Sequence, residues 1–191
     1  MRAMRDDPIA LFQRAAAIAD ATVSGARPGQ LGHPTPCTLW TVRQLINHML
    51  TGNLFFVSLA TGAPPPDRTA DHVGDDHVAS FRDSLARLSA AFSEPGFLSK
   101  HVPTPDGEGT GAVLADMRCN EFMIHSWDLA KATGQSTDLD RELAERVLAS
   151  MRASALLARV RGEGGPVGEQ RPAPANANPA DQLAAFMGRI V

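Results

Sequence analysis

The chain has little cysteine, no excess of positive charge and no long apolar segment, and each absence excludes a class of protein. Only Cys37 and Cys119 are cysteines. They are far apart and outside a CxxC spacing, which favours free thiols in a reducing compartment over a disulfide framework. Both are expected to pack and not to act as nucleophiles. The net charge is −3 with scattered Lys and Arg, so no basic stripe for nucleic acid is present.

No run of about 18 apolar residues occurs, so no membrane-spanning helix is expected. Hydrophobic residues make up 43% and charged residues 20% of the chain, which is the balance of a soluble globular protein. The N-terminus carries Asp6 and Asp7 ahead of a helical pattern and lacks the features of a secretory signal. We therefore expect residues 1–191 to form one domain of a cytoplasmic protein, as a monomer or homodimer.

Helical periodicity dominates the sequence, and the alternation typical of strands is nearly absent. Helices are expected over 8–24, from the cap Thr41 to just before Thr61, and over 75–92, 111–133 and 138–160, with a final turn or two from Asp181. Four long helices followed by a fifth predict an all-α protein. The expected architecture is a four-helix bundle with an additional C-terminal helix and an irregular tail.

The stretch "PTPCTLWTVRQLINHML" at 34–50 contains a complete signal for a helix start. Thr41 can be the N-cap, and Gln44 three residues later can bond back to the backbone of Thr41. Such a start fixes the direction of the side chains one to two turns further on, including His48. Gly52, one turn beyond, leaves room beside that histidine.

The helix expected over 111–133 is apolar on every side, which is typical of a buried helix. Within it Glu121 and His125 share one face. A buried carboxylate needs a cation, which could be Arg118, His125 itself, or a metal ion held with a third ligand from a neighbouring helix. Three protein ligands and an open position make a catalytic zinc site, and the same donors suit Fe²⁺ or Ni²⁺. His48 is the histidine best placed to be the third ligand.

Several other polar residues have two open interpretations. Asp128 and Asn47 can orient the ligand histidines through hydrogen bonds, or they can be ordinary surface and capping residues. Arg118 can neutralise the buried carboxylate or hold an anionic substrate. The loops 62–75 and 94–111 are longer than usual connections, so we expect both to flank the site and admit a ligand.

Two segments, "TPCTLWTVRQLINHML" and "NEFMIHSWDLAKATGQ", resemble the signatures of the DinB/YfiT-like metalloenzyme superfamily. The resemblance is to the actinobacterial branch related to the N-terminal domain of mycothiol-dependent maleylpyruvate isomerase. The ending "GEQRPAPANANPADQLAAFMGR" is similar to the end of that branch, so nearly the whole chain is covered. The resemblance implies a DinB-like four-helix bundle in which His48, Glu121 and His125 are the metal ligands. Gln44 and Ser126 depart from the residues common in relatives, and neither is a ligand.

An open metal site can lower the pKa of a bound thiol for attack on an electrophile, or it can activate water. The resemblance favours a metal-dependent thiol transferase or isomerase. Mycothiol or a similar low-molecular-weight thiol would be the cosubstrate, zinc the expected metal, and nickel or iron the alternatives. The expected partners are the thiol and an electrophilic small molecule, without nucleic acid or membrane. A metal-dependent hydrolase of a small ester or amide, a metal-binding regulatory protein without catalysis, and a purely structural polar triad remain open.

Overall fold

The computed structural model describes residues 7–38, 40–104, 107–154, 157, 161–162 and 167–191. Its helices are α2 (Pro8–Gly25), α3 (Val42–Thr61), α4 (His77–Phe92), α5 (Gly111–Thr133), α6 (Arg141–Ala153) and α8 (Pro179–Phe186), with 3-10 turns η1 (Pro28–Gln30) and η2 (Phe97–Ser99). Strands β1 (His101–Thr104) and β2 (Gly107–Thr110) form an antiparallel hairpin in which His101 pairs with Thr110. The described part is therefore all-α apart from one hairpin, which confirms the predicted fold class.

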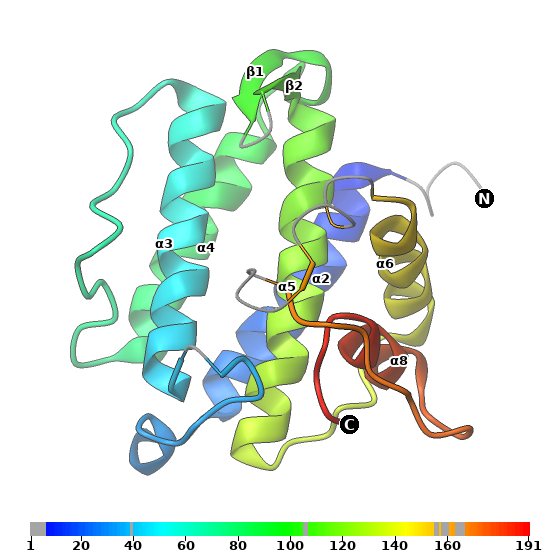
Figure 1. Ribbon diagram of the computed structural model, residues 1–191. Helices are drawn as coiled ribbons and strands as arrows, with labels where there is room; N and C mark the ends of the chain where they lie inside the picture. The colour runs from blue at the N-terminus through cyan, green and yellow to red at the C-terminus, as the bar shows by residue number, and fades with distance from the viewer. Residues whose placement is uncertain (1–6, 39, 105–106, 155–156, 158–160, 163–166) are drawn as a thin grey trace.

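The four long helices α2, α3, α4 and α5 form the bundle (Figure 1). Helix α5 packs against both α2 and α3, and α4 packs against α3 and α2. Aromatic rings fill the space between them, because Phe12 contacts Phe122 with ring centroids 6.1 Å apart and Phe81 contacts the same ring at 6.3 Å. Helix α5 is thus surrounded by other elements along much of its length, as its apolar pattern predicted.

The local signals for helix ends are confirmed. Asp7 caps α2 by accepting from the backbone of Ile9 at 3.1 Å. At the start of α3, Gln44 N–H donates to Thr41 Oγ1 at 3.4 Å, and Thr41 N–H donates to Gln44 Oε1 at 2.9 Å. Helix α5 ends at Thr133 and is capped by Gly134, whose φ of 73° lies in the left-handed region that glycine adopts without strain. The direction of His48 is therefore set by the reciprocal cap.

Several boundaries differ from the predictions. Helix α6 starts later than the predicted 138, because Asp140 is its N-cap and accepts from Leu143 N–H at 3.0 Å. It ends at Ala153, well before the predicted 160; much of the remaining segment lies outside the described residues. Helix α8 has about the predicted length but begins at Pro179, two residues before the predicted Asp181, because Asn178 caps it by accepting from Asp181 N–H at 2.9 Å. The predicted loop 94–111 contains η2 and the hairpin, which buries Val102.

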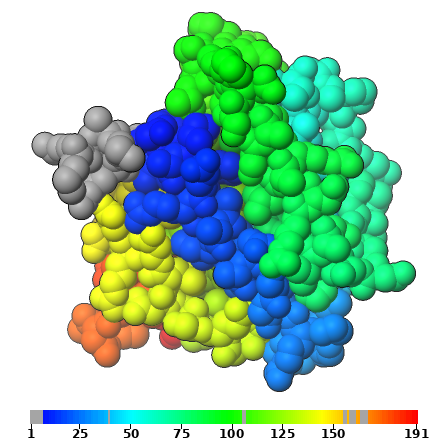
Figure 2. All heavy atoms as spheres, turned by 180° about the vertical axis from the view of Figure 1, so that it is seen from behind, coloured from blue at the N-terminus to red at the C-terminus, as the bar shows by residue number. Residues whose placement is uncertain are grey.

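Seen from behind, helix α2 lies on the surface of the molecule between α4 and α6 (Figure 2). Ion pairs join these helices: Arg82 Nε lies 2.7 Å from Asp20 Oδ1, and Arg14 Nη2 lies 2.7 Å from Asp140 Oδ2. Helix α8 packs on α6 and on α5, which brings the C-terminal segment against the bundle. No helix in the described part of the chain is long and apolar enough to cross a bilayer.

Candidate metal centre

His48 of α3 and Glu121 and His125 of α5 come together in the structure. Each offers one ligand atom, and these atoms all lie within 4.8 Å of one another. His48 Nε2 lies 2.9 Å from Glu121 Oε1. The two imidazole centroids are 5.0 Å apart, with the rings nearly perpendicular at 83°. Two imidazoles and a carboxylate are a donor set of three-ligand zinc sites, which leave a fourth position open. The three residues therefore fit a divalent metal.

Arg118 holds the second oxygen of Glu121. Its Nη1 donates to Glu121 Oε2 at 2.5 Å, and its Nη2 donates to Asn53 Oδ1 at 2.6 Å. The side chain is 0% exposed and lies over the rings of Phe56 and Phe122, 5.2 and 4.3 Å from their centroids. The structure thus places Arg118 as the neutralising cation behind the carboxylate and not in the cavity, where it would meet an anionic substrate.

The surroundings of Glu121 keep it ionised and leave it room. Burial acts to raise the pKa of Glu121, but the charge of Arg118 and the hydrogen bond with His48 outweigh it and hold the pKa below its ordinary value. A carboxylate ligand must be ionised to bind metal. At Gly52, a Cβ would lie 2.7 Å from Arg118 Nη1 and 3.5 Å from Glu121 Oε1. The room expected at Gly52 is therefore used by this ion pair.

Asp128 contacts His125, in agreement with its predicted orienting role. Asp128 Oδ2 lies 3.1 Å from His125 Nδ1, an arrangement that leaves Nε2 of that imidazole as the ligand atom. Arg189 binds the same carboxylate with two groups, Nε to Oδ1 at 3.0 Å and Nη2 to Oδ2 at 2.9 Å. Burial acts to raise the pKa of Asp128, but the hydrogen bonds with His125 and Arg189 hold it below its ordinary value. No local sequence pattern pointed to Arg189.

Of the two interpretations of Asn47, the structure does not support the orienting one, because its side-chain amide bonds to the loop between α3 and α4. Its Nδ2 donates to the Ala70 carbonyl at 3.0 Å, and its Oδ1 accepts from His72 N–H at 2.8 Å. The neighbouring Arg43 donates to Asp71 at 2.9 Å. The loop between α3 and α4 lies against this face of α3, and its backbone groups need partners. Asn47 therefore anchors the loop instead of the histidines.

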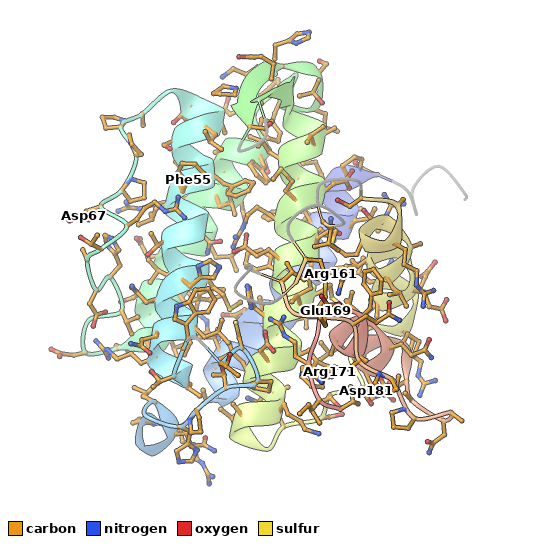
Figure 3. The ribbon with its side chains drawn as sticks, viewed as in Figure 1. Phe55, Asp67, Arg161, Glu169, Arg171 and Asp181 are labelled. Atoms are coloured by element: carbon orange, nitrogen blue, oxygen red, sulfur yellow. The ribbon has the colours of Figure 1, made fainter. Side chains whose placement is uncertain are left out.

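The cluster borders a cavity of about 920 Å³. Its walls come from α3, from the loop between α3 and α4, and from α5. Trp40 stacks on His48, with ring centroids 4.3 Å apart and an interplanar angle of 22°. On another part of the wall, Arg68 Cζ lies 5.4 Å from the centroid of the Phe55 ring. Figure 3 labels Phe55 on α3 and Asp67, the residue before Arg68, on the loop that faces it. Among the residues described, no carboxylate forms an ion pair with Arg68.

Only one of the two predicted flanking loops lines this cavity. Residues 68–71 of the loop between α3 and α4 contribute to the wall, whereas no described residue of 94–111 does. The second segment folds as the hairpin at the other end of α3, where Lys100 Nζ donates to the Ala60 carbonyl at 2.7 Å. The prediction that 94–111 flanks the site is not confirmed, because this segment folds as the hairpin and no described residue of it lines the cavity.

Neither cysteine belongs to the ligand cluster. Cys119 is buried, with its Sγ 3.7 Å from the Leu11 carbonyl. Burial and the charge of Asp116 raise its pKa to about 12. Cys37 is half-buried and is not a member of the cluster. Cys119 in particular is unsuited to act as a nucleophile at neutral pH.

Fold and site together define an all-α, DinB-like helical bundle with a candidate metal centre between two of its helices. Residues 12–130 match the family model described as the mycothiol maleylpyruvate isomerase N-terminal domain. The chain belongs to this family, as the resemblance of its two signature segments indicated.

Relatives in sequence and in structure agree with this assignment. Uncharacterized proteins from two strains of Mycobacterium tuberculosis are each 40% identical over 185 residues, covering 97% of this chain and 99% of theirs. The crystal structure of the mycothiol-dependent maleylpyruvate isomerase aligns with a TM-score of 0.64 at 21% identity, covering 83% of this chain and 73% of that chain. A histidine-to-alanine mutant of that enzyme gives the same values. The structural likeness shows the shared fold.

Proposed function

We propose that this protein is a metal-dependent enzyme that uses a metal-bound, low-molecular-weight thiol of the mycothiol type either to transfer the thiol to an electrophilic substrate or to isomerise that substrate. His48, Glu121 and His125 would hold the metal, for which zinc is the expected ion and nickel or iron the alternatives. The observation that carries the proposal is the convergence of these three side chains beside an open cavity. The family is named after a mycothiol-dependent isomerase, and this membership supports mycothiol or a similar thiol as the cosubstrate.

A divalent metal in this site would lower the pKa of a thiol bound to it, so that a thiolate is supplied near neutral pH. The residues of the chain prepare the site for this chemistry. Asp128 accepts from His125 Nδ1 and so fixes which imidazole nitrogen faces the cluster. Trp40 stacks on the ring of His48 and covers one of its faces. The buried thiol of Cys119 does not compete as a nucleophile, because its pKa is raised to about 12.

The electrophile would occupy the cavity beside the cluster. Arg43 also lines the wall, but its Nε donates to Asp71 Oδ2 at 2.9 Å. Arg68 lines the same wall without an ion pair among the described residues. We propose that Arg68 faces an anionic group of the electrophile, the role that Arg118 cannot fill because it is buried behind Glu121.

Residues 1–191 are proposed to form one domain, which is supported by the packing of α8 on α5 and by the pair between Arg189 and Asp128. A cytoplasmic location is proposed with it, because a free thiol cosubstrate requires a reducing compartment.

Cobalt-substituted protein tests the proposal. Mycothiol, or N-acetylcysteine as a simpler probe, should produce a near-ultraviolet band of thiolate-to-metal charge transfer. The band should persist in Cys37→Ser and vanish in His125→Ala. If neither thiol produces the band while a small ester or amide is hydrolysed at a rate that follows metal content, the protein is a hydrolase. If metal binds and neither result is obtained, a regulatory role without catalysis is favoured.

A further inference from the structure

The C-terminal segment reaches the candidate metal centre from outside the part of the chain that matches the family model. That match ends at residue 130, whereas Arg189 follows α8 near the end of the chain. Arg189 is buried at 9% exposure, and the carboxylate that it contacts, Asp128, is 0% exposed. Buried charges of this kind persist only when they are paired and hydrogen-bonded. The ion pair between Arg189 and Asp128 is therefore part of the protein interior and not a solvent-exposed surface contact.

The geometry of this contact limits how Asp128 can move. Arg189 donates from Nε and Nη2 to the two different oxygens of the carboxylate, at 3.0 and 2.9 Å. A guanidinium bound in this way fixes the plane of a carboxylate, which a lysine ammonium cannot do. One of the two oxygens, Oδ2, also contacts His125 Nδ1 at 3.1 Å. The orientation of His125 thus depends on a carboxylate whose own orientation is fixed by Arg189.

Other contacts hold the C-terminal segment in the position that this pair requires. Trp127, next to Asp128 on α5, donates from Nε1 to Asp181 of α8 at 2.7 Å. Arg189 Nη1 donates to the Met187 carbonyl at 2.8 Å. Arg161 donates to the Phe186 carbonyl at 2.6 Å without contacting Asp128. Figure 3 shows Arg161 and Asp181 in this part of the molecule, beside α5.

We propose that Arg189 is a positioning residue for the metal centre, acting through Asp128 on the ligand His125. The inference rests on the proposed function, because it requires that His125 binds metal. Partners that orient a ligand imidazole typically contribute 10- to 100-fold to metal affinity. Linkage requires that metal binding in turn favours the contact between Arg189 and Asp128.

The test compares Arg189→Met, Arg189→Lys and Asp128→Asn with the control Arg161→Met, which loosens the same segment without touching the carboxylate. Zinc dissociation constants are measured by competition with a chromophoric chelator, and the ligand geometry is followed in the visible spectrum of the cobalt-substituted protein. We expect Arg189→Met to weaken zinc binding by roughly 10- to 100-fold and to change the cobalt spectrum. Arg189→Lys should recover part of the loss. Arg161→Met should lower the melting temperature but leave the zinc constant and the cobalt spectrum as in wild type.

The double variant Arg189→Met with Asp128→Asn gives a second comparison. It should bind zinc no more weakly than Asp128→Asn alone, because both substitutions act on one path. Fully additive losses would overturn the inference, as would a wild-type zinc constant and cobalt spectrum in Arg189→Met. If Arg189→Met does not fold, Arg189→Lys and Asp128→Asn decide by the same criteria. Wild-type protein that binds neither zinc nor cobalt would overturn the proposed function and this inference together.

Discussion

Arg118 and Glu121 form an ion pair across one turn of α5 in which the cation is wholly buried and the carboxylate is not. The Arg118 side chain is 0% exposed and that of Glu121 is 24% exposed. The positive charge therefore lies behind the carboxylate, and Glu121 Oε1 remains directed at His48, 2.9 Å away. This asymmetry allows one carboxylate to be neutralised from within the bundle and still be offered to a metal at the cavity.

Arg118→Met should destabilise the metal-free protein by about 2–4 kcal/mol, because it leaves Glu121 and the side-chain Oδ1 of Asn53 without their buried partner. Zinc should restore part of this loss, since the ion supplies a cation to Glu121. Urea unfolding with and without zinc measures both effects. In the control Arg82→Met, loss of the exposed pair with Asp20 should change the free energy of unfolding little, because solvent screens the pair. Equal losses in the two variants would contradict the burial argument.

Gly52→Ala should weaken zinc binding by roughly tenfold even though alanine is the better helix former by about 1 kcal/mol. The added Cβ would lie 2.7 Å from Arg118 Nη1, so the guanidinium must move away from Glu121. Calorimetric titration with zinc measures the change. Thr51→Ala is the matched control, because Thr51 lines the same cavity and its hydroxyl has no hydrogen-bond partner among the described residues. Unchanged zinc affinity in Gly52→Ala would contradict the prediction, because it would show that zinc binding does not depend on the position of Arg118 beside Glu121.

Asn47→Ala should release the loop between α3 and α4 without removing metal. The substitution breaks the hydrogen bonds to the Ala70 carbonyl and from His72 N–H, each worth about 1 kcal/mol. Trypsin should then cleave after Arg68 faster than in wild type, while zinc affinity stays within about twofold. Loss of zinc with unchanged cleavage would instead support an orienting role for Asn47 at the histidines.

Native protein should expose at most one reactive thiol. Because the pKa of Cys119 is raised to about 12, only roughly one molecule in ten thousand carries that thiolate at pH 8. A chromogenic disulfide reagent at pH 8 should therefore leave Cys119 unmodified in Cys37→Ser until denaturant is added. Rapid modification of one full equivalent in native Cys37→Ser would contradict the burial of Cys119, because the reagent would have reached its thiol beside Leu11 of α2.

The parts of the fold that local patterns determine were predictable from the sequence. The spacing of Glu121 and His125 places them on one face of any helix, and the cap formed by Thr41 and Gln44 sets the direction of His48. The helical spacing and the cap each involve only a few neighbouring residues, so they do not depend on how the rest of the chain folds. The assembly of the three side chains from two helices needed the resemblance to a known family as well.

Contacts between distant segments were not predictable in this way. Arg189 lies 61 residues from Asp128, and only the packing of α8 on α5 brings them together. The role of Asn47 stayed open for the same reason, because its partners are backbone groups of a loop whose path no local pattern specifies. The hairpin that contains Val102 is short, with glycine at two of the four positions of β2, so it lacks the alternation by which strands are recognised.

Metal binding by wild type and Glu121→Ala tests the central claim most directly. Both proteins are purified without an affinity tag, freed of metal with a chelator, reloaded with zinc and analysed by mass spectrometry for metal per chain. We predict about one zinc ion per chain in wild type and less than about a tenth of that in Glu121→Ala, because two imidazoles alone do not complete the three-ligand set. Full zinc occupancy in Glu121→Ala, or none in wild type, would contradict the assignment of His48, Glu121 and His125 as a metal centre.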